Sequence, residues 1–274
     1  MLSGVAVHAP IATAGQKTKE SDEPGQQLVD RQGEWLASHG LDAAESVVFP
    51  DAVRFIRRPY DVFSANAEAL EADFDLRTAG RSSAPISATN TLLGDRIFAE
   101  PGARVEASVL NSRSGAIYLA AGSEIMEGSL VRGGLALGEG AQLKLGSKIY
   151  GATTIGPGSR VGGEVNNSVL WGNSNKGHDG FLGNAVLGEW CNLGADTNNS
   201  NLKNDYSEVK LWSYPSGRFE PTGLQFCGLV MGDHSKAGIN CMFNTGTVVG
   251  VACNVFGAGF PRNSIPDFSW GGPQ

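Results

Sequence analysis

The sequence has few cysteines and no long apolar run. Its four cysteines, Cys191, Cys227, Cys241 and Cys253, contain no C-x-x-C pair, and a chain of this size needs no cross-links to bury a core. We therefore expect reduced thiols. No apolar run reaches the roughly 18 to 20 residues of a membrane span, and residues 1–15 lack the basic start and apolar centre of a signal peptide. These absences predict a cytoplasmic protein with no membrane partner.

Basic residues are also in deficit. The chain has 21 Lys and Arg against 28 Asp and Glu, which gives a formal net charge of -7 at pH 7. Such a chain has no general attraction to nucleic acid or to an anionic membrane surface. A ligand that carries phosphate would therefore need a local group of Lys or Arg side chains.

Glycine, in contrast, is abundant, and its excess accompanies a repeat. The chain has 38 glycines among 274 residues, about twice the usual share of roughly 7%, and most of the excess follows Gly94. Aliphatic residues there stand six apart, at Leu137, Leu143, Ile149, Ile155 and Val161. Small or β-branched residues follow four positions later, at Ala141, Ser147, Thr153, Ser159 and Val165. The pattern restarts at Phe181, Leu187 and Leu193, with Ala185, Cys191 and Thr197, and again at Met231, Ala237, Phe243, Val249 and Val255.

A period of six fits neither a helix nor an alternating strand. It predicts one short strand per hexad and three hexads per triangular coil, with stacked coils burying one aliphatic column. The fold class is therefore mainly β, a parallel β-helix over residues 91–274. Two stretches, 166–180 and 199–226, break the register, and loops that leave a regular scaffold are common places for binding chemistry.

Residues 1–90 form a different, small α+β segment. Its first 24 residues are polar and indicate a flexible lead-in. Loosely helical spacing predicts helices at 26–41 and 61–76, and residues 47–63 resemble one or two short strands interrupted by prolines. Residues 79–94 read as a linker. In the second helix, the residues expected to face a core are Val62, Phe63, Leu70 and Phe74.

His178 is the first candidate for catalysis. Imidazole, with an ordinary pKa of roughly 6.5, is well suited to remove a proton near neutral pH. A single His between glycines on a surface turn is, however, more often simply solvated. His234 falls at a hexad turn, where a structural role is expected. These two His residues are too few for a three-His zinc site.

The repeat and its loops resemble a known family. The motifs are SNKGHDGFLGNAVLGEWCNLGADTNNSNLK and MGDHSKAGINCMFNTGTVVG, and they resemble the C-terminal acetyltransferase domain of the bifunctional UDP-N-acetylglucosamine diphosphorylase/glucosamine-1-phosphate N-acetyltransferase enzymes. RRPYDVF, GRSSAPISATNT and GAGFPRNSIPDFSWGG are similar to the Bacteroidetes-type branch. The resemblance covers about residues 55–274 and implies a left-handed β-helix.

The resemblance implies a role for each matching residue. His178 matches the general base that deprotonates the substrate amine. Lys148 and Asn192 match residues that hold phosphate and sugar, and Ala195 and Asn201 match contacts to acetyl-CoA. Taken without the resemblance, Lys148 is equally well explained as a solvated corner residue, Ala195 as a repeat position and Asn201 as a turn former.

Two matching positions depart from the better-known branch. Asn166 stands where those enzymes carry Lys, and Phe181 stands where they carry Tyr, so the identity of the sugar is in question. Lys176 is a further candidate for substrate binding, with a solvated corner as its alternative. Lys210 is the last substrate-binding candidate, and Lys203 remains an alternative to it.

The resemblance predicts an acetyl-CoA-dependent N-acetyltransferase that acts on an amino-sugar 1-phosphate, needs no metal for acetyl transfer and assembles as a homotrimer. The family's nucleotidyltransferase domain is mostly missing, because only about residues 45–78 match its last segment and no Gly-rich phosphate loop followed by Arg or Lys is present. Two alternatives stay open: a truncated sugar-1-phosphate nucleotidyltransferase and a non-catalytic trimeric β-helix scaffold.

Overall fold

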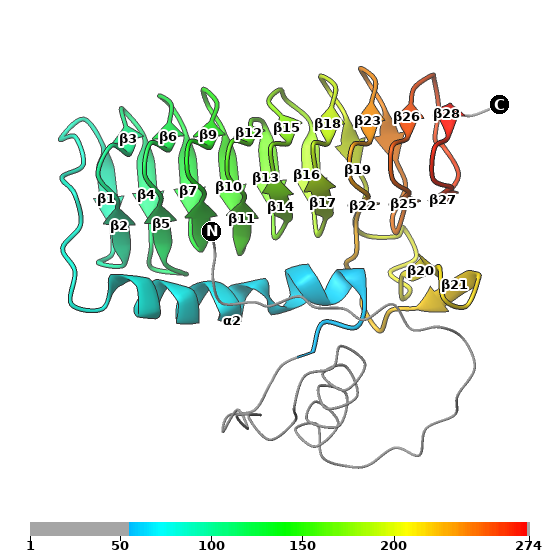
Figure 1. The fold of residues 1–274 in the computed structure, drawn as a ribbon, viewed down its shortest axis with the longest axis horizontal. Helices are drawn as coiled ribbons and strands as arrows, with labels where there is room; N and C mark the ends of the chain where they lie inside the picture. Colours follow the sequence, from blue (N-terminus) through cyan, green and yellow to red (C-terminus); the bar gives the residue numbers. More distant parts are fainter. Residues whose placement is uncertain (1–54, 273–274) are drawn as a thin grey trace, which may run out of the picture. The chain divides into compact units, whose positions relative to one another are not determined.

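The computed structural model describes residues 55–272. The chain divides into two compact units, Met1–Arg57 and Arg58–Gln274. The helix expected at 26–41 and residues 47–54 of the strand region expected at 47–63 lie outside the described residues. In the second unit, one helix, α2 (Pro59–Thr78), precedes a long series of short strands, and Figure 1 shows these strands stacked coil upon coil.

The coils build three faces of parallel strands. The first face contains β1 (Thr91–Leu93), β4 (Val109–Asn111), β7 (Leu130–Arg132), β10 (Lys148–Tyr150), β13 (Glu164–Asn166) and β16 (Phe181–Gly183), followed by the separate pair β19 (Asn198–Asn199) and β24 (Met242–Phe243). The second face contains β2 (Ile97–Ala99), β5 (Ile117–Leu119), β8 (Leu135–Leu137), β11 (Thr153–Ile155), β14 (Val169–Gly172), β17 (Val186–Glu189), β22 (Val230–Met231), β25 (Val248–Val249) and β27 (Ser264–Ile265). The third face contains β3 (Arg104–Val105), β6 (Glu124–Ile125), β9 (Gln142–Leu143), β12 (Arg160–Val161), β15 (Asn175–Lys176), β18 (Asn192–Leu193), β23 (Lys236–Ala237), β26 (Asn254–Val255) and β28 (Trp270–Gly271). The predicted parallel β-helix is thus confirmed.

One apolar column fills the coils. The aliphatic residues at six-residue spacing from Leu137 to Val161 are all buried, and so are the small residues predicted between them. Several buried hydroxyls bond to nearby carbonyls; the Ser147 Oγ, for example, donates to the Lys144 O at 2.5 Å. Because each coil leaves its apolar residues uncovered at both ends, the stack as a whole supplies the burial that no single coil could.

Two details of the predicted register are wrong. The residue that points inward on β16 is Leu182, which is buried, whereas Phe181 lies half-buried on the outside. Residues 166–180 do not leave the scaffold, since β14 and β15 lie within them. The physical reason is that some coil sides are shortened. Successive buried residues are four apart from Val161 to Val165, five apart from Val165 to Leu170 and five apart from Leu182 to Leu187, instead of six, which shifts the phase without any loop.

The second predicted break is a real excursion. Residues between β19 and β22 contain an antiparallel hairpin of β20 (Lys210–Ser213) and β21 (Arg218–Pro221). Val209 and Leu211 of this excursion pack in one buried cluster with Val186 and Val248 of the second face and Phe63 of α2. The hairpin is therefore fixed against the second face.

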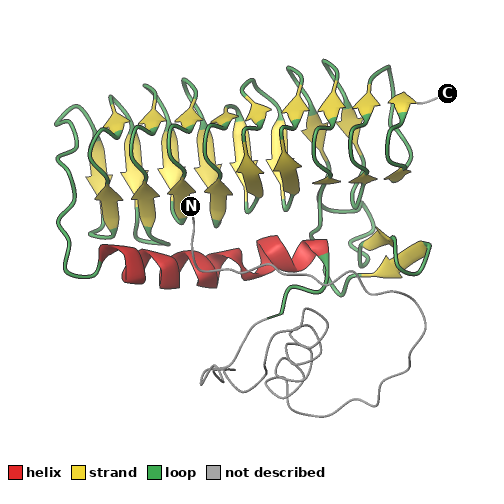
Figure 2. Cartoon of the chain, viewed as in Figure 1, coloured by secondary structure: helices red, strands yellow, loops and turns green. Residues whose placement is uncertain are grey.

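Helix α2 also packs along the second face (Figures 1 and 2). The helix predicted at 61–76 is confirmed, and Phe63, Leu70 and Phe74 are buried as expected. The strand expected to run to Phe63 is wrong at its end, because Pro59 opens the helix, where its fixed φ and missing N–H are tolerated. Within the described part of the chain, no helix is long and apolar enough to cross a membrane.

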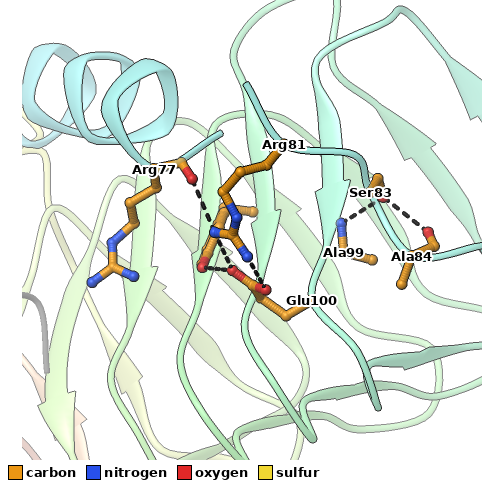
Figure 3. Close-up of polar contacts among 7 residues, drawn as sticks. Arg77, Arg81, Ser83, Ala84, Ala99 and Glu100 are labelled. Atoms are coloured by element: carbon orange, nitrogen blue, oxygen red, sulfur yellow. Dashed lines mark hydrogen bonds and ion pairs between the residues drawn. The ribbon is translucent and has the colours of Figure 1, made fainter. Parts of the chain in front are cut away.

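Polar contacts join the end of α2 to the first coils (Figure 3). The Arg81 guanidinium donates to the Arg77 O at 2.9 Å and pairs with the Glu100 carboxylate at 2.6 Å. The Tyr118 hydroxyl donates to the same carboxylate at 2.5 Å, and these donors hold the pKa of Glu100 below its ordinary value, the Arg81 hydrogen bond foremost. The Ala99 N–H donates to the Ser83 Oγ at 2.9 Å. The segment predicted as a linker is thus bonded to the β-helix.

Candidate active site

His178 lies on a corner turn between β15 of the third face and β16 of the first face. Its side chain is exposed to solvent, and its backbone is held on several sides. The His178 O accepts from the Lys176 Nζ at 2.6 Å, and the Asp179 O accepts from the Asp196 N–H at 3.1 Å. The Gly180 O accepts from the Glu164 N–H at 3.2 Å. The turn therefore carries an accessible imidazole on a backbone bonded to the coils on both sides.

Glycines let this turn fit between its neighbours. A Cβ on Gly163, in the preceding coil, would lie 2.8 Å from the Asp179 Cα. Gly180 has φ +118° and a Cβ there would lie 2.2 Å from the Thr197 O of the following coil. No side chain can occupy either position without moving the backbone that carries His178.

On the first face, a row of side chains leads away from this corner. Lys148, Glu164 and Phe181 are in register on the neighbouring strands β10, β13 and β16, which places each about 4.8 Å from the next. Lys148 is exposed. The Tyr150 hydroxyl donates to the Glu164 Oε1 at 2.5 Å, and this hydrogen bond is the main cause of the raised pKa of Tyr150.

Asn166 and Asn201 flank Phe181 on the same face. Asn166 is in register with Gly183. A Cβ on Gly183 would lie 2.4 Å from the Phe181 Cζ and 2.8 Å from the Asn201 Nδ2, so the phenyl ring and the amide converge over this glycine. The Asn201 Nδ2 donates to the Asn184 Oδ1 at 2.8 Å. A flat aromatic surface with amides around it suits a sugar ring or a comparable small polar ligand.

Asn192 and Ala195 approach the corner from the third face. The Asn192 Oδ1 accepts from the Asn175 Nδ2 at 2.9 Å. Asn175 stands two residues before the His178 turn begins. Ala195 is on the same corner one coil further along, next to Asp196, whose N–H bonds the His178 turn. The Ala195 O accepts from the Asn240 N–H at 2.8 Å. The corner thus continues past His178 through the turns at Ala195 and Asn240, and we call this line of turns the open edge.

Three lysines proposed as ligands or alternatives occupy different surroundings. The Lys176 side chain points into the column and is only 2% exposed. The Lys203 Nζ donates to the Glu208 O at 2.6 Å within its own loop. Lys210 is exposed on β20, in the hairpin packed on the second face. Lys148 is in register with Glu164 and Phe181 on the first face, whereas Lys210 lies on the β20–β21 hairpin and not on that face.

Sequence reasoning missed two residues of this corner. Glu164 stands two positions before Asn166 on β13, and the alternation of a strand puts both on the outer surface, so this signal was available. Ile239 precedes Asn240 on the open edge beside Ala195, and its side chain is 70% exposed. An apolar side chain at this edge offers a surface to an aliphatic ligand. Within residues 55–272 no cluster of three or more His, Cys, Asp or Glu could hold a metal ion.

Together, the fold and this corner define a parallel β-helix protein with an exposed His beside a polar face. No protein-family model matches the chain. A stretch of 90 residues, 33% of this chain and 21% of the relative, is 36% identical to the bifunctional protein GlmU of Methanocaldococcus jannaschii. Another of 93 residues, 34% of this chain and 23% of the relative, is 31% identical to a bifunctional sugar-1-phosphate nucleotidylyltransferase/acetyltransferase of Sulfurisphaera tokodaii.

A third relative, GlmU of Methanococcus aeolicus, is 28% identical over 96 residues, 30% of this chain and 23% of the relative. The resemblance to the acetyltransferase part of such bifunctional proteins is therefore confirmed over about a third of the chain. The chain spans less than a quarter of the length of these relatives.

Among solved structures, a mutant GDP-perosamine N-acetyltransferase of Caulobacter crescentus, with CoA and GDP-perosamine, is 11% identical over 92% of this chain and 91% of that one. Its TM-score is 0.14. A likeness at this TM-score supports no conclusion about fold or function.

Proposed function

We propose that the protein is an acetyl-CoA-dependent N-acetyltransferase that acts on an amino-sugar 1-phosphate, with glucosamine 1-phosphate as the first candidate, in UDP-N-acetylglucosamine synthesis. The observation that carries this proposal is the His178 turn. Its imidazole is exposed while its backbone is bonded to the coils on both sides. The partial sequence relationship to bifunctional nucleotidylyltransferase/acetyltransferase proteins supports the same chemistry.

In the proposed reaction, the His178 imidazole accepts a proton from the substrate ammonium group, and the freed amine nitrogen attacks the thioester carbonyl of acetyl-CoA. The new C–N bond forms, the nitrogen loses its second proton to solvent as the C–S bond breaks, and the CoA sulfur leaves with the proton returned by the imidazolium. Backbone N–H groups and the Asn201 amide stabilise the oxyanion during attack. No step requires a metal ion or a covalent enzyme intermediate.

The row on the first face would hold the sugar. Lys148 would pair with the phosphate as a compact charge, the Glu164 carboxylate and the Asn166 and Asn192 amides would bind hydroxyls, and the sugar ring would lie against Phe181. Acetyl-CoA would follow the open edge along Ala195 and Ile239, where the exposed apolar side chain suits its aliphatic arm. Because the edge is open to solvent in one chain, we further propose a homotrimer in which a neighbouring copy closes it.

The test is release of CoA thiol from acetyl-CoA in the presence of glucosamine 1-phosphate, with galactosamine 1-phosphate alongside. We expect turnover by the wild-type protein and a loss of about 100-fold or more in His178→Ala, the range of general-base catalysis. His234→Ala is the matched control, because His234 is also an exposed corner residue, and its turnover should be unchanged. Light scattering at the assay concentration tests the trimer.

Other outcomes identify the alternatives. Absence of turnover on both sugars by a folded trimer would indicate a non-catalytic scaffold. Formation of a nucleotide sugar from UTP and magnesium would indicate the truncated nucleotidyltransferase. Equal losses in the His178 and His234 variants would show that the His178 turn is not the site.

A further inference from the structure

Lys176 occupies a place in the β-helix that belongs to apolar residues. It is in register with Val161 on the neighbouring strand β12, and both side chains point into the column, where Lys176 is 2% exposed and Val161 is fully buried. The corresponding inward residue of the next strand on this face, β18, is Leu193. A charged side chain is costly at such a position unless hydrogen bonds compensate it.

The compensation comes from two carbonyls beneath the His178 turn. The Lys176 Nζ donates to the Gly162 O at 2.9 Å and to the His178 O at 2.6 Å. Asp179 and Asp196, on the same corner in consecutive coils, favour the charged form, although burial outweighs them and lowers the pKa of Lys176 to about 8. The ammonium therefore bonds, from inside the coil, the backbone of the residue whose imidazole faces outward.

We propose that Lys176 is a positioning residue, which holds the His178 carbonyl from within the β-helix and thereby fixes where the imidazole meets the substrate. This inference rests on the proposed acetyl transfer, in which the imidazole is the general base. It replaces the predicted direct contact between Lys176 and the substrate, because the ammonium is enclosed and already bonded to two carbonyls. An aliphatic residue would fill the column equally well but would leave the turn without this bond.

The kinetic test compares Lys176→Met with Lys148→Met. Methionine keeps most of the length of the side chain and its apolar contacts but removes the donor. We expect Lys176→Met to lower kcat by about 10- to 100-fold, the usual cost of a displacement on the scale of 1 Å, while KM for both substrates stays within about twofold. Lys148→Met, which removes an exposed lysine on the first face, should instead raise KM for the sugar phosphate.

A second measurement does not depend on turnover. Millisecond hydrogen exchange with mass spectrometry should show faster exchange of the amides at residues 177–180 in Lys176→Met, with the buried strands β12 and β18 unchanged. If methionine prevents folding, Lys176→Gln retains two N–H donors and should show smaller changes of the same kind. Faster exchange throughout the coils would mean a purely structural role and would overturn the proposal.

The outcomes separate this proposal from the proposed function. A variant with wild-type kcat and unchanged exchange at 177–180 refutes the positioning role. A raised sugar KM with unchanged kcat identifies Lys176 as a ligand of the substrate. If the wild-type protein itself shows no acetyl transfer, the proposed function fails, while the exchange experiment still decides whether Lys176 holds the turn.

Discussion

Lys148 and Lys176 carry the same charge in opposite surroundings. Lys148 is exposed on the first face, and Lys176 is enclosed in the apolar column. Water solvates the first ammonium at little cost, but the second depends on the Gly162 and His178 carbonyls. A neutral substitution should therefore change the free energy of unfolding differently at the two positions. The dependence of that free energy on pH measures the difference.

Burial of Lys176 predicts a pH-dependent stability. Its pKa is about 8 in the folded protein against an ordinary value of 10.5, so between these values the unfolded chain binds more protons and stability rises with pH. At pH 7 the shift corresponds to a cost of about 3 kcal/mol, and hydrogen bonds to the carbonyls offset part of it. Lys176→Met should therefore be about as stable as wild type, or more stable, at pH 7.

The check is urea unfolding of both proteins at fixed protein concentration from pH 7 to 10.5. The free energy of unfolding of the wild type should rise relative to that of Lys176→Met across this range, because other titrating groups are common to both. A difference between the two proteins that is independent of pH would show that the lysine is not charged and buried in the folded state.

At the scale of the element, the His178 turn depends on glycine at its ends. Gly180→Ala should cost about 2 kcal/mol or more, since φ +118° is open essentially to glycine alone and the new Cβ meets the Thr197 O. Gly140→Ala is the matched control. Gly140 is another corner glycine, with φ +63° and no atom within 4 Å of an added Cβ, so it should cost only about 1 kcal/mol.

Thermal unfolding measures both costs, and the acetyl-transfer assay gives the second readout. Gly180→Ala should also lower kcat, because the turn can accept a Cβ only by moving. Gly140→Ala should leave kcat unchanged. Equal stability losses in the two variants would contradict the close approach of the turn to the following coil.

For the whole of the second unit, α2 links coils that are far apart along the stack. Phe63 packs with Val186 and Val248, while Leu70 packs in a separate cluster with Phe98 and Tyr118 near the first coils. A β-helix alone has contacts only between neighbouring coils, which allows its ends to unfold separately. A helix along one face couples them and makes unfolding more cooperative.

Leu70→Ala tests this coupling. The side chain is buried, 5% exposed, and lies against Gly134, so its truncation should cost about 2 to 4 kcal/mol and broaden the thermal transition. Leu76→Ala is the control on the same helix, because Leu76 is 74% exposed and should change stability by about 0.5 kcal/mol at most. Calorimetry measures both, and equal effects would contradict a role for α2 in holding the coils together.

The sequence by itself determined the β-helix and most of its core. A period of six is a local property, because every hexad repeats the same inward position. Leu137, Ile149 and Val255 could therefore be assigned to the core without any structure. The buried side of the second predicted helix followed in the same way from its spacing. His178 was found from its residue type and from the motif around it.

The positions of side chains that depend on the register between coils were decided only by the tertiary structure. The shortened side between Leu182 and Leu187, which are five apart instead of six, places Leu182 inward and Phe181 outward, and no pattern within one hexad records that shift. Lys176 could be placed inside the column only once its strand was aligned with β12. A strand that slips by one residue exchanges its two faces, so the pairing of neighbouring coils decides which side chains reach the substrate and which support the site from within.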